Sequence, residues 1–317
     1  MSDATLETGE EVKRPSRLKG ALSTLALLRE SPVGMVGAGL VLFWVVVALL
    51  APILPLNDPN EPLMPFQPII SVPQPDGTVL TLGEGAGYPG DVGPNGETLW
   101  FGLDHKGRDM LSRVIWGSRT VLFWATFATA VAYAVGMIMG VMAGYFGRWV
   151  DEVISFIANV LLSFPVLVLY IVIITNLGPS GTNVVLAVTF ASAPQIMRIV
   201  RGLALDIKTR DYIAAAQTRG ESALYIMFVE LLPNAKGPLI VDACLRLGYT
   251  TIAIATLGFL GLGLPPPDAD WGKIIVESMP SAQFAPHMVV IPAIAISSLV
   301  LGFNLMADGL REIAMRD

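Results

Sequence analysis

The apolar positions of this chain fall into six long stretches that are separated by shorter polar segments. A helix needs about 20 mostly apolar residues to cross a bilayer core of roughly 30 Å, and each stretch approaches or exceeds that length. The stretches cover residues 33–54, 120–143, 153–177, 183–200, 239–260 and 288–307. The pattern therefore predicts an all-α integral membrane protein with about six transmembrane helices.

The same pattern divides the chain into regions. An N-terminal segment, 1–32, precedes the first transmembrane helix at 33–54, and a large loop follows at 55–117. A core of five helices occupies 118–310, with a long polar connection at 201–237, and a tail at 311–317 follows. Within the large loop, residues 78–82 predict a short strand beside a Pro-Asp-Gly turn, and residues 109–116 predict a helix leading towards the second span.

Lysine and arginine gather on one side of the predicted membrane. With six spans, the segments before span one, between spans two and three, between spans four and five, and after span six share that side and carry most of the basic residues. The large loop lies on the other side and has eight acidic residues against three basic ones. Because basic residues favour the cytoplasmic side, both termini are expected in the cytoplasm and the large loop outside.

Composition supports a membrane protein. Hydrophobic residues make up 53% of the chain and charged residues only 15%, whereas soluble domains carry about a quarter charged residues. The net charge of −6 argues against nucleic acid as a partner. The one cysteine, Cys244, lies in an apolar run, which indicates a packed, inert thiol.

Motifs for enzymatic chemistry are incomplete. Residues 85–90 match G-x-G-x-x-G, but no strand precedes them and Pro89 prevents the helix that would hold phosphate. The Walker pattern G-x-x-x-x-G-K-[ST] does not occur in the chain. His105 and His287 lie in separate loops without a neighbouring cysteine, so a zinc site or histidine-based catalysis lacks parts. The sequence therefore predicts no catalytic residue, no metal site and no cofactor bound by this chain.

A stripe of small residues runs along the second span. Gly136, Gly140 and Gly144 repeat every four residues, which lets another helix approach closely. Two interpretations stay open: the stripe packs against a helix of the same chain, or against a partner subunit.

The connection between spans four and five predicts two short helices around a bend. Asp211 is expected to cap a helix that runs through Thr218, and Gly220 to end it with a positive φ. Ser222 is expected to cap the next helix and Pro233 to stop it. The small face formed by residues 214–216 would let a protein groove come close, and an exposed apolar helix of this kind needs a partner to cover it.

This connection resembles the EAA loop of binding-protein-dependent ABC importers, whose pattern is E-A-A, three residues, Gly, nine residues, I-x-L-P. The matching residues are Ala215, Ala216, Gly220, Leu232 and Pro233. Ala214 stands where the pattern has Glu, and Glu230 stands where it has Ile.

Further stretches resemble one branch of that family. Residues 102–113 and 116–119 are similar to the G-T-D-x-x-G-R-D-x-x-S-R segment of dipeptide, oligopeptide and nickel permeases. Other matching stretches, in the same order, are 144–147, 150–151, 201–202, 257–263, 266–267, 270–272, Asn304 and 308–311. The chain is most similar to the second, C-type, permease subunit.

The resemblance implies a type I ABC importer permease of the bacterial inner membrane. It implies a homologous B-type permease partner, two cytoplasmic ATPases that bind ATP and magnesium, and an external solute-binding protein. Peptides are the implied substrate. The residues that would couple to the ATPases are Asp211, Ala214, Ala215, Ala216, Gly220, Glu230, Leu232 and Pro233.

Three alternatives stay open. A permease of the same family could carry nickel chelates, opines or glutathione instead of peptides. A secondary transporter is a rival class, although the two halves of the chain show no sequence similarity. A structural or receptor role is the third alternative.

Two further groups of polar residues are candidates for function. The first, near the entrance to span two, is either a folded external gate or a segment that merely anchors that span. Its members are Asp104, Gly107, Arg108, Asp109, Ser112 and Arg113. The second is Asp242 and Arg246 in span five, which share one helix face and should avoid lipid. This pair either packs the helix or lines the cytoplasmic half of a translocation path.

Overall fold

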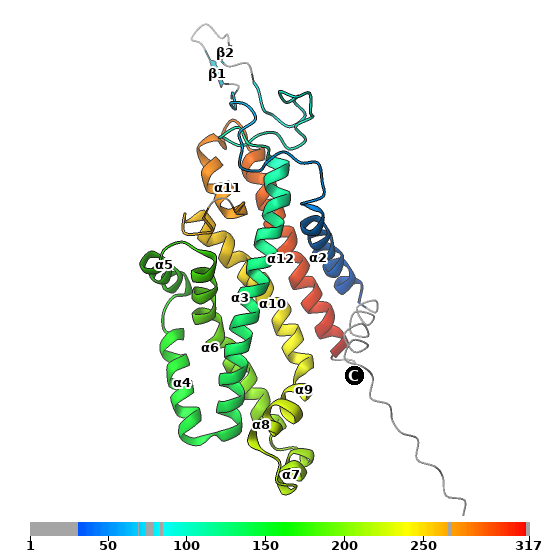
Figure 1. The fold of residues 1–317 in the computed structure, drawn as a ribbon, viewed down its shortest axis with the longest axis vertical. Coiled ribbons are helices and arrows are strands. Elements are labelled where there is room, and N and C mark those ends of the chain that lie inside the picture. Colours follow the sequence, from blue (N-terminus) through cyan, green and yellow to red (C-terminus); the bar gives the residue numbers. More distant parts are fainter. Residues whose placement is uncertain (1–30, 69, 74–78, 83–84, 266–267, 315–317) are drawn as a thin grey trace, which may run out of the picture.

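The computed structural model describes residues 31–68, 70–73, 79–82, 85–265 and 268–314. Long helices run side by side, and a loop region covers one end (Figure 1). The helices are α2 (Pro32–Leu50), α3 (Met110–Phe146), α4 (Arg148–Leu162), α5 (Val166–Leu177), α6 (Gly181–Ile207), α7 (Asp211–Thr218), α8 (Ala223–Tyr225), α9 (Leu232–Asn234), α10 (Lys236–Phe259), α11 (Trp271–Ser278) and α12 (His287–Ala314). A π-helical turn, η2 (Ile226–Leu231), joins α8 to α9, and a 3-10 turn, η3 (Met279–Ser281), follows α11.

Five of the predicted spans are confirmed as long apolar helices. Among the described residues, α2, α3, α6, α10 and α12 are long and apolar enough to cross a membrane. Helix α3 begins at Met110, so the helix predicted at 109–116 is continuous with span two. Large apolar side chains remain exposed along these helices; Leu42 and Leu49 of α2 are 61% and 68% exposed. Such exposure suits a lipid solvent.

The apolar stretch 153–177 predicts a single third span, but the structure has two helices there. Helices α4 and α5 meet at an angle of 87° across Ser163–Pro165. Proline has no N–H and forces the residue before it out of the helical region, and Pro165 itself has an extended backbone, with ψ 128°. The described residues therefore contain six candidate spans only if this bent pair counts as one.

The glycine stripe on α3 packs against α6 of the same chain. A Cβ added to Gly136 would lie 2.7 Å from the Cβ of Ile196, and one added to Gly140 would lie 2.6 Å from that of Val200. Gly144 meets Ala204 in the same way. The intrachain interpretation of this stripe is confirmed, and the α3–α6 pair forms the centre of the bundle.

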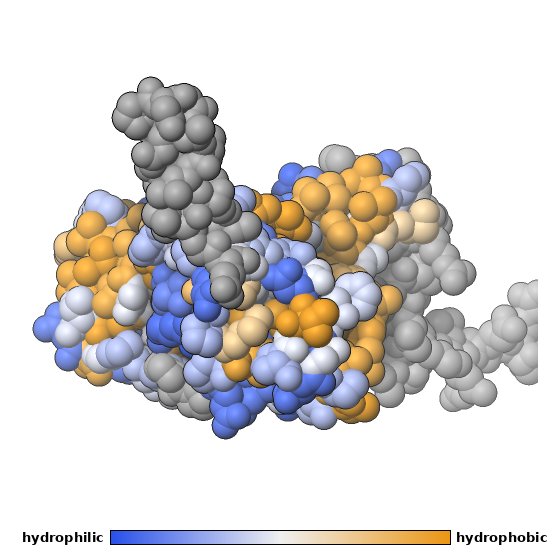
Figure 2. Space-filling view, turned by 90° about the horizontal axis from the view of Figure 1, so that it is seen from above, coloured by the Kyte–Doolittle hydropathy of each residue, from blue (hydrophilic) through white to orange (hydrophobic). Residues whose placement is uncertain are grey.

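The two ends of the bundle differ. At one end lie the large loop, α11 and a hairpin of β1 (Ile70–Pro73) and β2 (Val79–Leu82), while α7 and α8 lie at the other (Figure 1). The predicted strand is confirmed in β2, which pairs antiparallel with β1. Seen from the loop end, hydrophilic side chains occupy the middle of the surface and apolar ones lie along its flanks (Figure 2).

Candidate functional site

The connection between α6 and α10 forms a compact unit at the α7 end. Helix α7 begins at Asp211, and Arg210 occupies the capping position without a side-chain hydrogen bond. The prediction that Asp211 is the cap is therefore wrong by one residue. Asp211 instead lies in the first turn, where a carboxylate interacts favourably with the helix dipole.

Gly220 ends α7 as predicted. Its φ is +77°, a conformation that side chains with a Cβ rarely adopt. The Gly220 N–H donates to the Gln217 carbonyl at 3.0 Å, and the Glu221 N–H donates to the Ala216 carbonyl at 3.2 Å. These two bonds form a Schellman motif, which fixes the direction in which the chain leaves α7.

The second short helix starts as predicted but does not stop. The Ser222 hydroxyl accepts a hydrogen bond from the Tyr225 N–H at 3.2 Å, which confirms Ser222 as a cap. Pro233 lies inside α9, and α10 begins at Lys236. The predicted stop at Pro233 is wrong because the π turn η2 widens the helix just before the proline, where one backbone hydrogen bond must be missing.

This unit is anchored on one side and open on the other. Ile213 and Ala216 of α7 are fully buried, and they pack in one apolar cluster with α6 residues such as Ala204. Ala214 and Ala215 are exposed. Exposed apolar side chains of the same unit include Tyr212, Leu224 and Tyr225, at 39%, 66% and 39% exposure. Leu232 is half-buried, and Glu230 lies 3.9 Å from the exposed Arg219.

At the loop end, the predicted polar group is folded rather than free. Asp104 is fully buried and pairs with Arg113 of α3 and, at 2.7 Å, with Arg108. Glu277 of α11 joins the same cluster, 2.8 Å from Arg108 and 2.8 Å from Lys106. We call these five residues the ion cluster. It joins the start of α3 to α11.

The remaining members of that group shape the loop. A Cβ added to Gly107, with φ +77°, would lie 2.0 Å from the Met64 carbonyl oxygen. Asp109 caps α3 by accepting from the Leu111 N–H at 3.2 Å, and the Ser112 hydroxyl donates to the Asn57 carbonyl. The loop is therefore tied to α3 at several points.

The charges of the ion cluster shift the acidity of its carboxylates. Burial by itself would raise the pKa of Asp104, but the guanidiniums of Arg113 and Arg108 outweigh it, and the pKa is lowered. At Glu277, burial again raises the pKa, but the hydrogen bonds from Lys106 and Arg108 outweigh it and lower the pKa to about 2. Oxygen and nitrogen atoms of Asp104, His105 and Glu277 lie within 4.8 Å of one another. Three cationic side chains already neutralise this group, which disfavours a metal ion there.

Asp270 caps helix α11. In the sequence it is matched only as part of the 270–272 stretch, with no role predicted for it. Asp270 is fully buried and accepts from the Gly272 N–H at 2.9 Å, and burial raises its pKa to about 6. Gly258 and Gly263 pack against its carboxylate, since a Cβ on either would lie within 2.5 Å of it. The Trp271 indole donates to the Val114 carbonyl at 3.0 Å.

Asp242 and Arg246 form the ion pair that their spacing predicts, with the carboxylate 3.3 Å from Nε. The Tyr133 hydroxyl of α3 donates to Asp242, and Arg246 donates to the Gln195 side chain of α6. Tyr133 and Gln195 were not predicted, because neither is near the pair in sequence. The pair therefore links three helices, and Arg246 is 9% exposed.

Arg246 also faces a groove. The groove has a volume of about 240 Å³ and lies between α5, α6 and α10. Its polar lining consists of Tyr170, Ser192, Gln195, Arg246, Tyr249 and Thr256. Arg246 therefore packs against its neighbours on one side and lies against the groove on another. That the pair lines a translocation path stays a prediction.

Comparison with known proteins identifies relatives of this chain. A family model described as "Binding-protein-dependent transport system inner membrane component" matches residues 136–316. The dipeptide transport system permease protein DppC of Alkalihalophilus pseudofirmus is 40% identical over 220 residues, covering 69% of this chain and 72% of that protein. The glutathione transport system permease protein GsiD of Escherichia coli O6:K15:H31 is also 40% identical over 220 residues, covering 69% and 73%.

A solved structure shares the fold. The inward-facing MetNI methionine ABC transporter matches with a TM-score of 0.52 and 20% identity, over 64% of this chain and 97% of that chain. The match supports the predicted importer-permease fold for the 64% of the chain that it covers.

Proposed function

The chain belongs to the family of binding-protein-dependent transport system inner membrane components, and from that membership we propose how it works and with which partners. It pairs with a homologous permease, and the two line a path for solute across the membrane. Two separate ATPase subunits hold the ATP and magnesium and supply the energy, and an external binding protein delivers the solute. This chain carries out no covalent chemistry of its own.

The proposed orientation follows from charge. The α7 end and both termini lie in the cytoplasm of a bacterium, because the basic segments gather there, and the loop end lies outside. The proposed regions are 1–32, the first span, the external loop, the five-span core and the tail at 311–317. The first span is shorter than the sequence indicated, since α2 ends at Leu50.

Peptides are the proposed solutes, because a dipeptide permease is among the relatives at 40% identity. Glutathione, itself a tripeptide, is the second candidate, because a glutathione permease is equally similar. Both candidates carry free carboxylates. Nickel chelates and opines have no relative of that name among those described above.

The α7 unit is the proposed site of ATPase coupling, and its geometry carries the proposal. Exposed Ala214 and Ala215 let a protein groove come close, while buried Ile213 and Ala216 fix α7 to the bundle. A push on α7 is then transmitted to α6, and through η2 to α10, as a rigid-body movement. Such a movement would switch the permease between inward-open and outward-open states.

The ion cluster has a separate proposed role at the outer entrance. Its buried ion pairs hold the start of α3 against α11, and we assign it to a folded part of the external gate that also anchors α3. The alternative is anchoring alone. Hydrogen exchange in the assembled importer distinguishes the two: a gate changes its protection when ATP binds, whereas an anchor keeps it constant.

Copurification tests the proposed function most directly. A tagged form of this chain, expressed with its neighbouring transport genes, should retain one further permease and two ATPase subunits. The purified complex should take up labelled dipeptide into proteoliposomes only with ATP and the binding protein. Uptake that is driven by an ion gradient without ATP would show a secondary transporter instead.

A further inference from the structure

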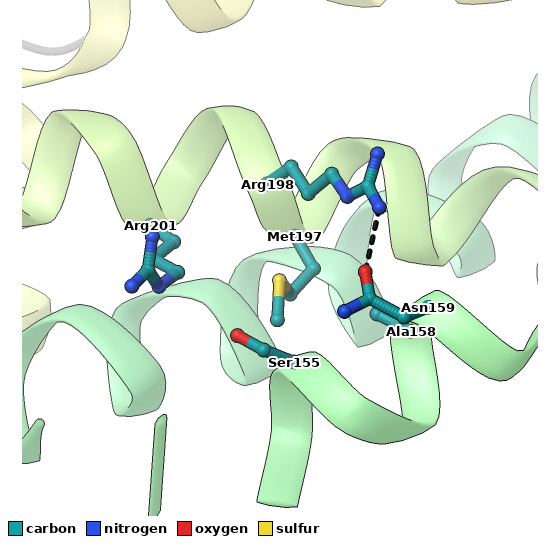
Figure 3. A pocket seen from close by; sticks show the side chains of 6 residues that line it. All are labelled: Ser155, Ala158, Asn159, Met197, Arg198 and Arg201. Atoms are coloured by element: carbon teal, nitrogen blue, oxygen red, sulfur yellow. Dashed lines mark hydrogen bonds between the residues drawn. The ribbon is translucent and has the colours of Figure 1, made fainter. Parts of the chain in front are cut away.

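A row of polar side chains runs along α6 within the membrane-spanning part. Ser192, Gln195, Arg198 and Arg201 follow one another at every third position, so successive members are neighbours on the helix surface. The first two line the groove beside α5 and α10. The last two line a second cavity, of about 420 Å³, between α4 and α6 (Figure 3). Each step of three residues turns by about 60° around the axis, so the row winds around α6 from one cavity to the other.

The arginines along this row differ in how they are neutralised. Arg201 makes a double hydrogen bond to Asp151, at 2.5 and 2.6 Å, and Arg246 pairs with Asp242. Arg198 donates only to the neutral Asn159 side chain, at 2.6 Å. Within the part of the chain that the structure describes, no carboxylate lies within ion-pair distance of Arg198. The cavity thus has one uncompensated positive charge.

The position of Arg198 indicates which anion can neutralise it. The apolar stretch of α6 covers residues 183–200, so Arg198 lies about 10 Å from the midpoint of that stretch along the helix axis, towards the α7 end. Arg198 is exposed in the isolated chain, and its side chain extends over the cavity to Asn159 of α4 (Figure 3). A charge within a span is costly unless it faces water or an anion. Because the guanidinium lies over a cavity between two helices, a dissolved anion fits better than a lipid headgroup.

We propose that the row on α6 borders a water-filled part of the solute path, where Arg198 binds the carboxylate of the transported solute. A guanidinium binds a carboxylate through charge-assisted hydrogen bonds. The Asn159 amide nitrogen points over the same cavity (Figure 3) and adds a second donor. The inference rests on the proposed import function, and it selects solutes with a free carboxylate over cationic ones.

A thiol placed in the cavity tests its water and its charge without any solute. Ser155 lines the cavity, so we would introduce S155C together with C244S and follow labelling on this chain. With each rate divided by the rate of the same reagent with a small free thiol, an anionic methanethiosulfonate reagent should react at least about fivefold faster than a cationic one. Adding R198Q should bring the two rates together. No labelling from either side in any nucleotide state, or equal rates with Arg198 present, would overturn the proposal.

Uptake by the assembled importer tests the role in transport. R198Q should lower ATP-driven uptake of labelled dipeptide by roughly tenfold to a hundredfold, while the loaded binding protein still stimulates ATP hydrolysis. R198K should keep most of the uptake. R119Q is the matched control, because Arg119 is an exposed arginine near the loop end of α3.

Three other results are informative. Normal uptake by R198Q would reject the solute-binding role. Loss of the partner permease from the R198Q complex would show that Arg198 holds that subunit, which also rejects the proposal. If the unmodified complex takes up neither dipeptide nor glutathione, the proposed function fails, while the thiol result still decides whether the cavity is wet and positive.

Discussion

The two ends of this bundle are stabilised by different chemistry. At the loop end, carboxylates and cations neutralise one another in a largely buried cluster, and Asp104 has no exposed surface. In the unit around α7, apolar packing and a Schellman motif stabilise the structure, and the ion pairs next to α7 are exposed or long. Buried ion pairs specify one geometry and are sensitive to the loss of a partner, whereas apolar packing tolerates changes of charge. The difference suits a fixed scaffold at the loop end and, at the α7 end, the partner-covered surface proposed above.

Removing a buried partner from the ion cluster should have the largest effect. Arg113→Met leaves Asp104 buried with only part of its compensation, so folding should lose about 3–5 kcal/mol. The matched change Lys106→Met removes a side chain that is 49% exposed, and should cost under about 1 kcal/mol. Thermal unfolding of the purified protein in detergent measures both. Equal unfolding temperatures for the two variants would show that the ion cluster is not what mainly stabilises the loop end.

The second effect concerns coupling at the α7 end. Gly220→Val places a β-branched residue at φ +77°, which costs roughly 1–3 kcal/mol of strain and should redirect the chain after α7. Uptake by the assembled importer should fall by about tenfold, with ATP hydrolysis no longer stimulated by the binding protein. Gly220→Asn should recover much of the activity, because Asn tolerates this conformation. Gly39→Val is the control, since Gly39 lies in α2 with open space around it.

The third effect is smaller: lowering the pH should destabilise the loop end gradually and change the stability of the α7 end little. The pKa of Glu277 is lowered to about 2, so its stabilising contribution is complete above its ordinary pKa and is lost as the pH falls towards 2. The pKa of Asp270 is raised to about 6, so folding gains as the pH falls from about 6 to the ordinary pKa of this carboxyl near 4. The loop end should therefore be most stable a little above pH 4 and weaken below it, where the contribution of Glu277 is lost.

Hydrogen exchange, corrected for the intrinsic effect of pH, measures this separation. Protection at 104–113 should fall between pH 4 and pH 3, while protection in α7 changes little. A parallel loss at both ends would contradict the comparison, because it would indicate global unfolding.

The smallest effect should come from an exposed ion pair at the α7 end. Asp206 and Arg210 are 3.0 Å apart, but their side chains are 63% and 60% exposed. Asp206→Asn should therefore leave the unfolding temperature unchanged within error. A clear drop would show that charge matters at this end too.

The sequence predicted those features that depend on local chemistry. The spans follow from apolar length, because lipid leaves few alternatives to a helix. The positive φ of Gly220 and the cap at Ser222 depend on residues within one turn, and both are confirmed. Pro165 marked an interruption, but the 87° angle could not be read from it because packing against other helices sets such an angle.

The unpredicted features depend on residues that are distant in the sequence. Glu277 and Arg108 are 169 positions apart in the sequence. No local pattern around Glu277 predicts a contact with a residue so distant. Tyr133 and Gln195 contact the Asp242–Arg246 pair from two other helices. Pro233 was expected to end a helix because proline cannot donate a hydrogen bond to the preceding α-helical turn. The π turn η2 before it changes the hydrogen-bond pattern, so the chain continues as a helix past Pro233.

The bend between α4 and α5 has a consequence for biogenesis. The two helices have 15 and 12 residues, or about 22 and 18 Å, so neither alone crosses a hydrocarbon core of about 30 Å. Ser163, Phe164 and Pro165 at the bend are exposed in the isolated chain. Irregular backbone is tolerated at membrane depth only where protein or water covers it. If the proposed partner permease covers this bend, a copy of the chain made alone leaves it exposed to lipid, and cells should degrade that copy faster than the assembled one.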